Sequence, residues 1–356
     1  MNRLRLPGTA EPDHLPPDIA VRRAADAWVD RVDPNRLRSV VESLPGPRNR
    51  VHAPDAMART DELLLATWRA AGWRTGRQRL RLRDLNARLY HPGERTVGPH
   101  PRHVYPELDG MNVVAIAEGQ TDEAIVIVAH HDTVRDSPGA DDNGSGLAAL
   151  LELALLFEGR RFHRTVILAA PDFEEIGLIG ARHLVRWLRG RYRVRGAVVF
   201  DPVGYMDSTP GSQVVPAGID RLYPGQVARL AERGNAGDTV VAVYRGISAA
   251  LVAEWARCLA ATIGPERVLM LRDPLDLPAI GPALALLPVA RNFSRSDHVR
   301  FWHAGMPAIQ VTDTANFRNP HYHRPTDTAD TLDYDTLARI TAATGLLVER
   351  LADTAG

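Results

Sequence analysis

The sequence contains no lysine, so all 43 of its basic residues are arginine. We attribute this to genome base composition; a functional reason, such as escape from lysine modification, is the weaker interpretation. Cysteine is almost as scarce. The one cysteine, Cys258, excludes an internal disulfide and a cysteine-based zinc knuckle. It lies in the helical pattern LVAEWARCLAATI, where we expect a small residue of the core.

Long apolar runs are missing as well. No stretch of about eighteen apolar residues occurs, so we expect no membrane span. The start, MNRLRLPGTAEPDHLPPD, lacks the apolar region of a secretory signal, and we therefore expect a cytoplasmic protein. Neither sign of charge is in excess, because the formal net charge is +0. This balance gives no reason to expect nucleic acid or an anionic membrane surface as a partner.

The sequence does contain enough apolar residues for a sizeable core. Of its 356 residues, 45% are hydrophobic and 24% are charged, which is typical of a globular protein. Residues 1–18 are polar and proline-rich and are predicted to form a tail. We predict one domain over residues 19–356, which includes N-terminal helices and has its core at 110–350.

Apolar strands alternate with helical segments along most of the chain. Residues 76–93 alternate apolar and polar side chains and are predicted to form a half-exposed strand. Further strands are predicted at 111–119, 123–132, 164–175, 195–204, 238–244, 265–271 and 306–313. Helices are predicted at 19–44, 55–73, 143–159, 180–190, 247–263, 296–304 and 334–352, and a long surface loop at 273–290. This alternation favours an α/β fold with three layers, α/β/α, around a central, mostly parallel (mixed) sheet.

Several of the predicted strands end in side chains that bind metal ions. In open α/β sheets, ligands bind beyond the carboxyl ends of the strands. The residues in that position, or in the loops that follow, are His130, His131, Asp132, Asp141, Asp142, Glu174, Glu175, Asp201, His321 and His323. Core packing does not produce this pattern, because buried carboxylates must be paired or bound to metal. Nitrogen and oxygen ligands without sulfur suit zinc, and cobalt or manganese also fit.

Glu174 and Glu175 are adjacent where a predicted buried strand leads into a helix. Repulsion and desolvation oppose such a pair unless a cation is close. Two metal ions, bridged by one carboxylate and about 3.5–4 Å apart, supply that positive charge. One glutamate, Glu175, then binds metal, and the other, Glu174, remains available as a general base.

Six motifs together resemble metallopeptidase family 28, a family of co-catalytic di-zinc aminopeptidases related to glutamate carboxypeptidase II and glutaminyl cyclase. The motifs are AHHD, PGADDNGSGLAALLELA, FEEIGLIGARHL, FDPVG, SRSDHVRFWHAGMPA and NPHYHRPTDTADTLDY. The resemblance covers roughly residues 110 to 350 and is weaker over the N-terminal helices. It implies a zinc-exopeptidase architecture and two Zn²⁺ ions per chain.

The resemblance also implies a role for each matching residue. His130 and Asp201 would bind one zinc ion, Glu175 and His323 the other, and Asp142 would bridge them. Three further residues would take part in catalysis: Glu174 as general base, Asp132 as hydrogen-bond partner of the far nitrogen of His130, and Tyr322 as donor to the developing oxyanion. A non-proline cis peptide bond is implied after Asp142. His131 has no implied role.

Other polar residues near these motifs have open assignments. Ser296, Asp297 and His298 are contiguous, so their side chains diverge and cannot form a nucleophilic triad. A role at the site is open for Asp297 and His298, and a role in capping a helix is open for Ser296 or Asp297. One of the arginines near the site loops is a candidate for binding a substrate carboxylate, the alternative being plain solvent exposure: Arg291, Arg295 or Arg318.

A zinc-dependent aminopeptidase acting on peptides or small amides is the first interpretation. A carboxypeptidase or an amidohydrolase is an alternative that the sequence does not separate from it, because the discriminating groups lie in loops such as 205–246 and 273–295. Acyl transfer of the glutaminyl-cyclase kind is another, and that chemistry uses a single zinc ion. A non-catalytic binding protein is the remaining alternative, but such proteins usually lose metal ligands and none is missing here. The sequence predicts no oligomeric state.

Overall fold

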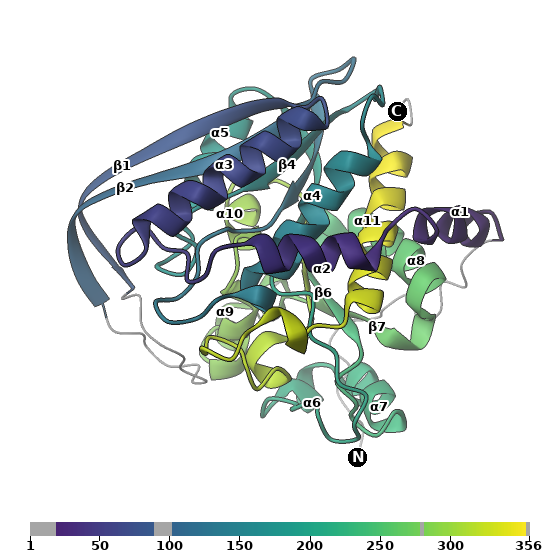
Figure 1. Cartoon of the computed structure of the whole chain (residues 1–356). Helices are drawn as coiled ribbons and strands as arrows, with labels where there is room; N and C mark the ends of the chain where they lie inside the picture. The colour runs from purple at the N-terminus through teal and green to yellow at the C-terminus, as the bar shows by residue number, and fades with distance from the viewer. Residues whose placement is uncertain (1–18, 89–101, 278–280, 354–356) are drawn as a thin grey trace.

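An eight-stranded mixed sheet runs through the centre of the protein (Figure 1). The computed structural model describes residues 19–88, 102–277 and 281–353, so the predicted tail at 1–18 lies outside the described residues. The strand order is β1-β2-β4-β3-β5-β8-β6-β7. The strands are β1 (Arg74–Arg88), β2 (Arg102–Ala117), β3 (Glu123–Val128), β4 (Thr165–Ala170), β5 (Arg193–Phe200), β6 (Val240–Tyr244), β7 (Val268–Arg272) and β8 (Ala308–Thr312).

The four central strands are parallel. β4, β3, β5 and β8 pair with one another in that order, so their carboxyl ends lie at the same edge of the sheet. β2 pairs with β4 in the antiparallel sense, and β1 pairs antiparallel with β2. On the other side, β6 is antiparallel to β8 and parallel to β7. The predicted mixed sheet is therefore confirmed.

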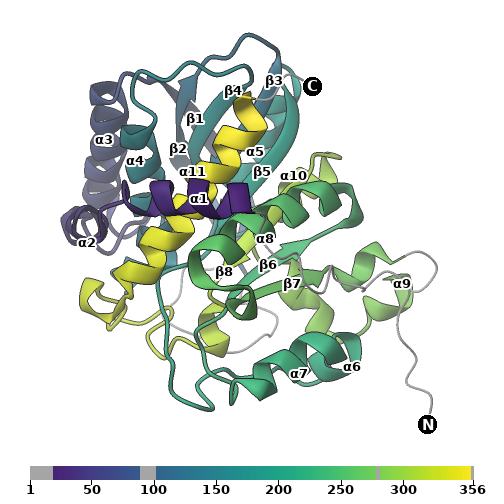
Figure 2. The ribbon, with the colours of Figure 1, turned by 90° about the vertical axis from the view of Figure 1, so that its right-hand side faces the viewer.

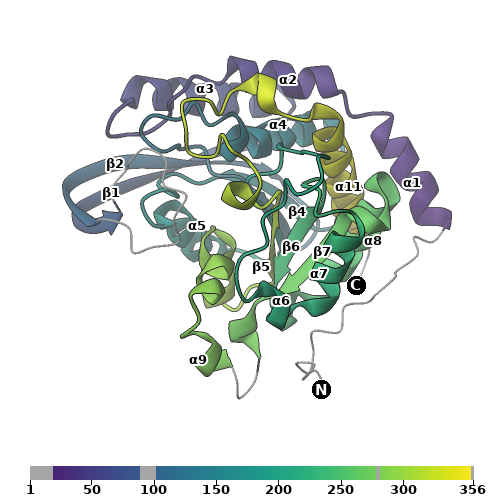
Figure 3. The ribbon, with the colours of Figure 1, turned by 90° about the horizontal axis from the view of Figure 1, so that it is seen from below.

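Helices cover both faces of the sheet, as the view from below shows (Figure 3). One face carries α1 (Ile19–Val29), α2 (Pro34–Ser43), α3 (Pro54–Ala70), α4 (Gly146–Leu156), α8 (Ala249–Ile263) and α11 (Tyr334–Asp353). The other face carries α5 (Ile179–Arg189), α6 (Ile219–Leu222), α7 (Pro224–Glu232), α9 (Gly281–Leu284) and α10 (His298–His303). This is the predicted three-layer arrangement.

Alternating side chains of each central strand enter the two cores. In β3, Ile125 and Ile127 belong to the core under α4 and α11, whereas Val126 and Val128 belong to the core under α5 and α10. Successive residues of a strand point to opposite faces, so a strand that is covered on both sides must be apolar throughout. This is why β3 and β4 appear in the sequence as continuous apolar runs.

Several predicted elements differ from the structure. The helix predicted at 19–44 is two helices, because Pro34 starts α2 and Asp33 caps it by accepting a hydrogen bond from the Asn35 N–H at 2.9 Å. β2 is longer than predicted and forms a long antiparallel pair with β1. The stretch 273–290 was predicted to be a loop, but it contains α9 and short helical turns at Pro274–Asp276 and Pro288–Ser294. α6 and α7 were not predicted.

One helical stretch, Gly246–Ile263, is long and apolar enough to cross a membrane by length and composition alone. It contains α8, which packs against both α1 and α11 (Figure 2). Trp255, Cys258 and Leu259 are fully buried there, as expected of a core helix. A cytoplasmic location stays a prediction.

Candidate metal centre

Side chains of the metal-binding types meet at the carboxyl edge of the four parallel strands. His130 follows β3, Glu175 follows β4 and Asp201 follows β5 directly. Asp142 lies in the loop before α4, and His323 lies between β8 and α11. The shared strand direction brings these distant positions of the chain together, as the sequence predicted.

The carboxylate of Asp142 lies between two imidazoles. Its Oδ1 is 3.1 Å from His130 Nε2, and its Oδ2 is 3.0 Å from His323 Nε2. Asp201 Oδ1 lies 3.7 Å from His130 Nε2, and Glu175 Oε2 lies 3.4 Å from His323 Nε2. Two groups of three potential ligands therefore share Asp142. The two carboxylate oxygens of Asp142 thus face one group each, which is compatible with a carboxylate that bridges two ions.

Four atoms of the potential ligands are buried and lack a hydrogen bond among the described residues. These atoms are His130 Nε2, Asp142 Oδ1, Glu175 Oε1 and His323 Nε2. Two of them, His130 Nε2 and Asp142 Oδ1, lie only 3.1 Å apart. An unsatisfied buried polar atom costs about 1–3 kcal/mol. A zinc ion in each group would satisfy these atoms, because imidazole nitrogen and carboxylate oxygen are its usual ligands outside cysteine sites. The residues present thus fit two divalent ions.

The electrostatics of the centre also favour added positive charge. Burial raises the pKa of Glu174 well above its usual range, and the nearby carboxylates of Asp201 and Glu175 add to this. Burial opposes protonation of His323, but Glu175 and Asp142 raise its pKa to about 10. Protons and metal ions would therefore compete for the same atoms of this centre.

Asp132 holds the segment that carries the two glutamates. Its carboxylate accepts hydrogen bonds from the main-chain N–H groups of Glu174 at 3.0 Å and Glu175 at 3.3 Å. His130 Nδ1 lies 3.0 Å from the main-chain oxygen of Asp132 and 3.6 Å from its carboxylate. The expected contact with His130 is thus present, with the carbonyl as the closer acceptor. Fixing the imidazole in this way orients Nε2 toward the centre.

Asp141, the neighbour of the potential bridging residue, faces away from the centre. Its carboxylate accepts hydrogen bonds from the Gly204 N–H at 2.8 Å and from Asn319 Nδ2 at 2.7 Å. The peptide bond between Asp142 and Asn143 is cis, as the resemblance implied. Asp141 therefore connects its own loop with the loops that carry Gly204 and Asn319. Of the two aspartates, Asp142 is the one that contacts the imidazoles of the centre.

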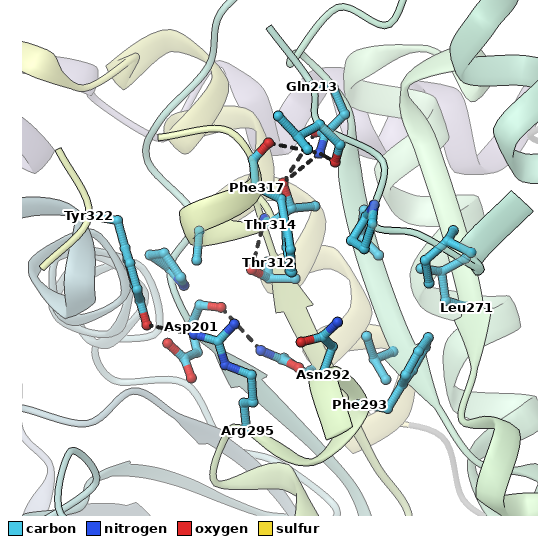
Figure 4. A pocket seen from close by; sticks show the side chains of 18 of the residues that line it. Asp201, Gln213, Leu271, Asn292, Phe293, Arg295, Thr312, Thr314, Phe317 and Tyr322 are labelled. Carbon is cyan, nitrogen blue, oxygen red and sulfur yellow. Dashed lines mark hydrogen bonds between the residues drawn. The ribbon is translucent and has the colours of Figure 1, made fainter. Parts of the chain in front are cut away.

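Tyr322 lies directly beside the centre. Its ring stacks on His323 with 3.8 Å between centroids and 16° between the ring planes. Its hydroxyl accepts a hydrogen bond from Arg295 Nη2 at 3.4 Å (Figure 4). Burial raises the pKa of the phenol well above its usual range, so Tyr322 keeps its proton and is able to donate it in a hydrogen bond.

The three arginines proposed for carboxylate binding have different surroundings. Arg318 is buried and donates to Gln213 Oε1 at 2.9 Å and to the Thr239 carbonyl at 2.7 Å, so it is a structural residue. Arg291 is exposed. Arg295 is half-buried and lines the cavity beside the centre.

Asp297 is a buried carboxyl group beside the centre that sequence analysis left unassigned. It precedes α10 but makes no capping hydrogen bond, and both of its carboxylate oxygens lack a hydrogen-bond partner among the described residues. Burial raises its pKa to about 7; His130 opposes the rise, and Asp201 and Asp132 contribute to it. The adjacent His298 is structural, because its Nε2 lies 3.1 Å from the Phe293 carbonyl.

His131 lies outside the centre. Its Nε2 is 3.0 Å from Asp61 Oδ1 in α3, and its Nδ1 is 2.8 Å from the Pro171 carbonyl. Asp61 in turn pairs with Arg50 at 2.9 Å. These contacts connect α3 with the ends of β3 and β4, which accounts for a second histidine next to His130.

A cavity of about 170 Å³ opens beside the centre. One side is formed by the potential metal ligands and Glu174. The other is largely apolar and is built from β6, β7, α6, α7 and the turn before α10; its residues include Ile219, Val227, Leu230, Val241, Leu269 and Phe293. Figure 4 shows Arg295 between Tyr322 and Asp201 on one side and Phe293 and Leu271 on the other. Reactive groups and an apolar binding surface thus share one cavity.

The chain is similar in sequence to known metallopeptidases. The model of peptidase family M28 matches residues 112–244 and 280–348. An uncharacterised Escherichia coli protein, YfbL, is 32% identical over 244 residues, which are 64% of this chain and 67% of that protein. A probable zinc metalloprotease of Leptosphaeria maculans is 29% identical over 231 residues, which are 59% of this chain and 48% of that protein. The match thus spans about half the length of the fungal relative.

Solved structures of low sequence identity share the fold. The LapA aminopeptidase of Legionella pneumophila has a TM-score of 0.63 at 18% identity, covering 98% of this chain and 79% of that one. BSAP, a zinc aminopeptidase from Bacillus subtilis, has a TM-score of 0.66 at 15% identity, covering 91% and 96%. The glutaminyl cyclase of Fimbriiglobus ruber has a TM-score of 0.56 at 19% identity, covering 89% and 95%. At these identities the likeness concerns the fold.

Proposed function

The chain belongs to peptidase family M28, and we propose that it is a di-zinc aminopeptidase that hydrolyses the N-terminal amide bond of peptides. The observation that carries this proposal is the Asp142 carboxylate, which lies 3.1 Å from His130 Nε2 and 3.0 Å from His323 Nε2. Both imidazole nitrogens are buried and lack a hydrogen-bond partner among the described residues. A bridging carboxylate between two open imidazoles supports a two-ion centre rather than a single site.

His130 and Asp201 would hold one ion, and Glu175 and His323 the other, with Asp142 shared. The two zinc ions, once bound, would lower the pKa of a shared water molecule and polarise the carbonyl of the scissile bond. Glu174 lines the same cavity, and its main chain is fixed by Asp132 at 3.0 Å. It would accept the proton of the attacking water and pass it to the leaving amine.

Tyr322 would donate a hydrogen bond to the oxygen that becomes negatively charged. Its ring is fixed against His323, so the hydroxyl is positioned before a substrate arrives. A preorganised donor of this kind favours the transition state over the ground state. Asp132 acts indirectly, because it fixes both the His130 ring and the turn that carries Glu174.

The proposal is tested with a peptide library in which each peptide has either a free or an acetylated N-terminus. Zinc-loaded protein should remove residues one at a time from the free N-termini only, and Glu174→Gln should abolish this loss in mass spectrometry. Shortening of acetylated peptides from their C-termini would instead establish a carboxypeptidase. Cyclisation of N-terminal glutamine by protein holding one zinc ion would establish acyl transfer of the glutaminyl-cyclase kind.

A further inference from the structure

We propose that Arg295 binds the C-terminal carboxylate of a dipeptide whose N-terminal side chain is large and apolar, so that the enzyme acts as a dipeptidase. This inference rests on the proposed function of the same centre. The metal ligands alone do not determine the length of the substrate or its N-terminal side chain.

Arg295 is a cation without an anionic partner. Its Nη1 donates to Asn316 Oδ1 at 2.7 Å, and its Nη2 donates to the Tyr322 hydroxyl at 3.4 Å. Among the described residues, no carboxylate lies within ion-pair distance of its guanidinium. Other buried arginines are satisfied within the protein. Arg50 pairs with Asp172 at 2.6 Å, and Arg318 is enclosed by several protein oxygens, whereas Arg295 faces the cavity. A guanidinium has five donors in a planar fork that matches a carboxylate.

The position of Arg295 fixes the length of the substrate. Tyr322, the proposed donor to the scissile carbonyl oxygen, is in direct contact with Arg295. In a dipeptide, only the amide nitrogen and one α-carbon separate the C-terminal carboxyl carbon from the scissile carbonyl carbon. Each further residue in an extended chain moves the carboxylate about 3.3–3.6 Å away. A carboxylate that reaches Arg295 belongs to the single residue after the scissile bond, and because the proposed aminopeptidase cleaves the N-terminal amide bond, that substrate is a dipeptide.

The apolar part of the cavity selects the N-terminal side chain. Val241 and Leu269 contribute from β6 and β7, and Val227 and Leu230 contribute from α7. The cavity volume is about 170 Å³, and an engineered apolar cavity of about 150 Å³ in another protein holds benzene. This volume includes the metal side, and it leaves room for one large apolar side chain such as leucine or phenylalanine. Among the described residues, the acidic ones that line the cavity all belong to the proposed metal centre, so the apolar part offers a basic side chain no partner there.

The test measures kcat/KM of zinc-loaded protein for Leu-Ala, Leu-Ala-NH2 and Leu-Glu-NH2. The amide removes the C-terminal charge, and the third substrate moves a carboxylate to the side chain. A charge-assisted pair of this kind gives roughly a ten- to hundredfold preference for Leu-Ala over Leu-Ala-NH2. Arg295→Gln should remove this preference, mainly by raising the KM for Leu-Ala. Arg295→Lys keeps the positive charge and should retain part of the preference.

Two matched variants serve as controls. Arg291→Gln removes an exposed arginine from the same segment and should keep the full preference. Arg88, at the end of β1, is the other arginine that lines the cavity, and Arg88→Gln should keep the preference as well. Loss of the preference in either control, but not in Arg295→Gln, would overturn the assignment to Arg295.

Other results would overturn the inference while leaving the aminopeptidase intact. One such result is an equal kcat/KM for Leu-Ala and Leu-Ala-NH2. Another is a kcat/KM for Leu-Glu-NH2 as high as that for Leu-Ala. A third is an equal decrease of kcat/KM for all three substrates in Arg295→Gln. If no substrate is cleaved, the proposed function fails instead. Calorimetry on zinc-loaded Glu174→Gln then decides the inference separately: it predicts tighter binding of Leu-Ala than of Leu-Ala-NH2, and equal affinities contradict it.

Discussion

Glu174 and Glu175 are adjacent and chemically identical, yet we propose different tasks for them. Glu175 Oε2 lies 3.4 Å from His323 Nε2 in one of the ligand groups that share Asp142. Glu174 lies outside both groups that share Asp142, although it forms a third potential group with His130 and Glu175. Glu174→Gln and Glu175→Gln are therefore a matched pair of variants. Both changes keep size and shape, and both leave the main-chain hydrogen bonds to Asp132 in place.

We expect Glu174→Gln to keep about two zinc ions per chain and to lose activity. General-base catalysis contributes typically 10²–10⁴-fold, which corresponds to roughly 3–5 kcal/mol of the activation free energy. Glu175→Gln should lower the zinc content to about one ion per chain after dialysis, because a neutral amide replaces a charged ligand. Its activity should fall as well, and added zinc should restore part of it.

The assay combines zinc content by plasma mass spectrometry with kcat on one peptide, for both variants and the unmodified protein. If Glu174→Gln lost zinc and Glu175→Gln kept both ions, Glu174 would be the metal ligand and Glu175 the candidate general base. Unchanged activity in Glu174→Gln would refute the general-base assignment, whatever the zinc content. Glu174 and Glu175 lie in the same turn. If either substitution merely disrupted this turn, both variants should lose a similar amount of thermal stability.

Three further predictions concern residues around the centre. Tyr322→Phe removes one hydrogen-bond donor to the oxyanion and should lower kcat about 10–10³-fold without changing the zinc content. Steady-state kinetics and metal analysis check this, and an unchanged kcat would exclude Tyr322 as the oxyanion donor. Asp132→Asn should weaken zinc affinity or activity about 10–100-fold, measured by competition with a chromogenic chelator, because the amide keeps only one of the two acceptors for the Glu174 and Glu175 N–H groups. Unchanged values of both would count against that contribution. The metal-free protein should lose stability as pH rises from about 6.5 toward 10, because the pKa of His323 is raised to about 10 and its protonated form is favoured in the folded state. Urea unfolding with a chelator at pH 6 and pH 9 checks this sign, and greater stability at pH 9 would contradict it.

The sequence predicts much of the fold because the central strands are buried on both faces. β3, β4 and the second half of β5 are apolar runs, and each strand is followed within a few residues by a potential ligand. The rule that ligands bind at the carboxyl ends of parallel strands then places His130, Glu175 and Asp201 together without knowledge of the loops.

The peripheral elements were less predictable because short-range patterns there are weak. α6 and α7 are four and nine residues long and lie in a segment rich in glycine and proline. The length of β2 depends on its pairing with β1 over fourteen residue pairs, which is a tertiary property. Such contacts override local propensity and are not visible in a single sequence.

The roles of charged residues around the centre depended on burial that sequence does not give. Arg318 and Arg295 both lie near the site motifs, but Arg318 is enclosed by Gln213 and Thr239, whereas Arg295 faces the cavity. Asp297 has the sequence position of a helix cap, yet its carboxylate makes no cap. The difference lies in which neighbours surround each side chain in three dimensions.

Anomalous X-ray diffraction at the zinc edge, on crystals of the zinc-loaded protein, would locate the ions themselves. We expect two zinc peaks about 3.5–4 Å apart, one on each side of the Asp142 carboxylate. One peak should adjoin His130 and Asp201, and the other should adjoin Glu175 and His323. A single peak, or peaks away from Asp142, would contradict the two-ion centre and the mechanism derived from it.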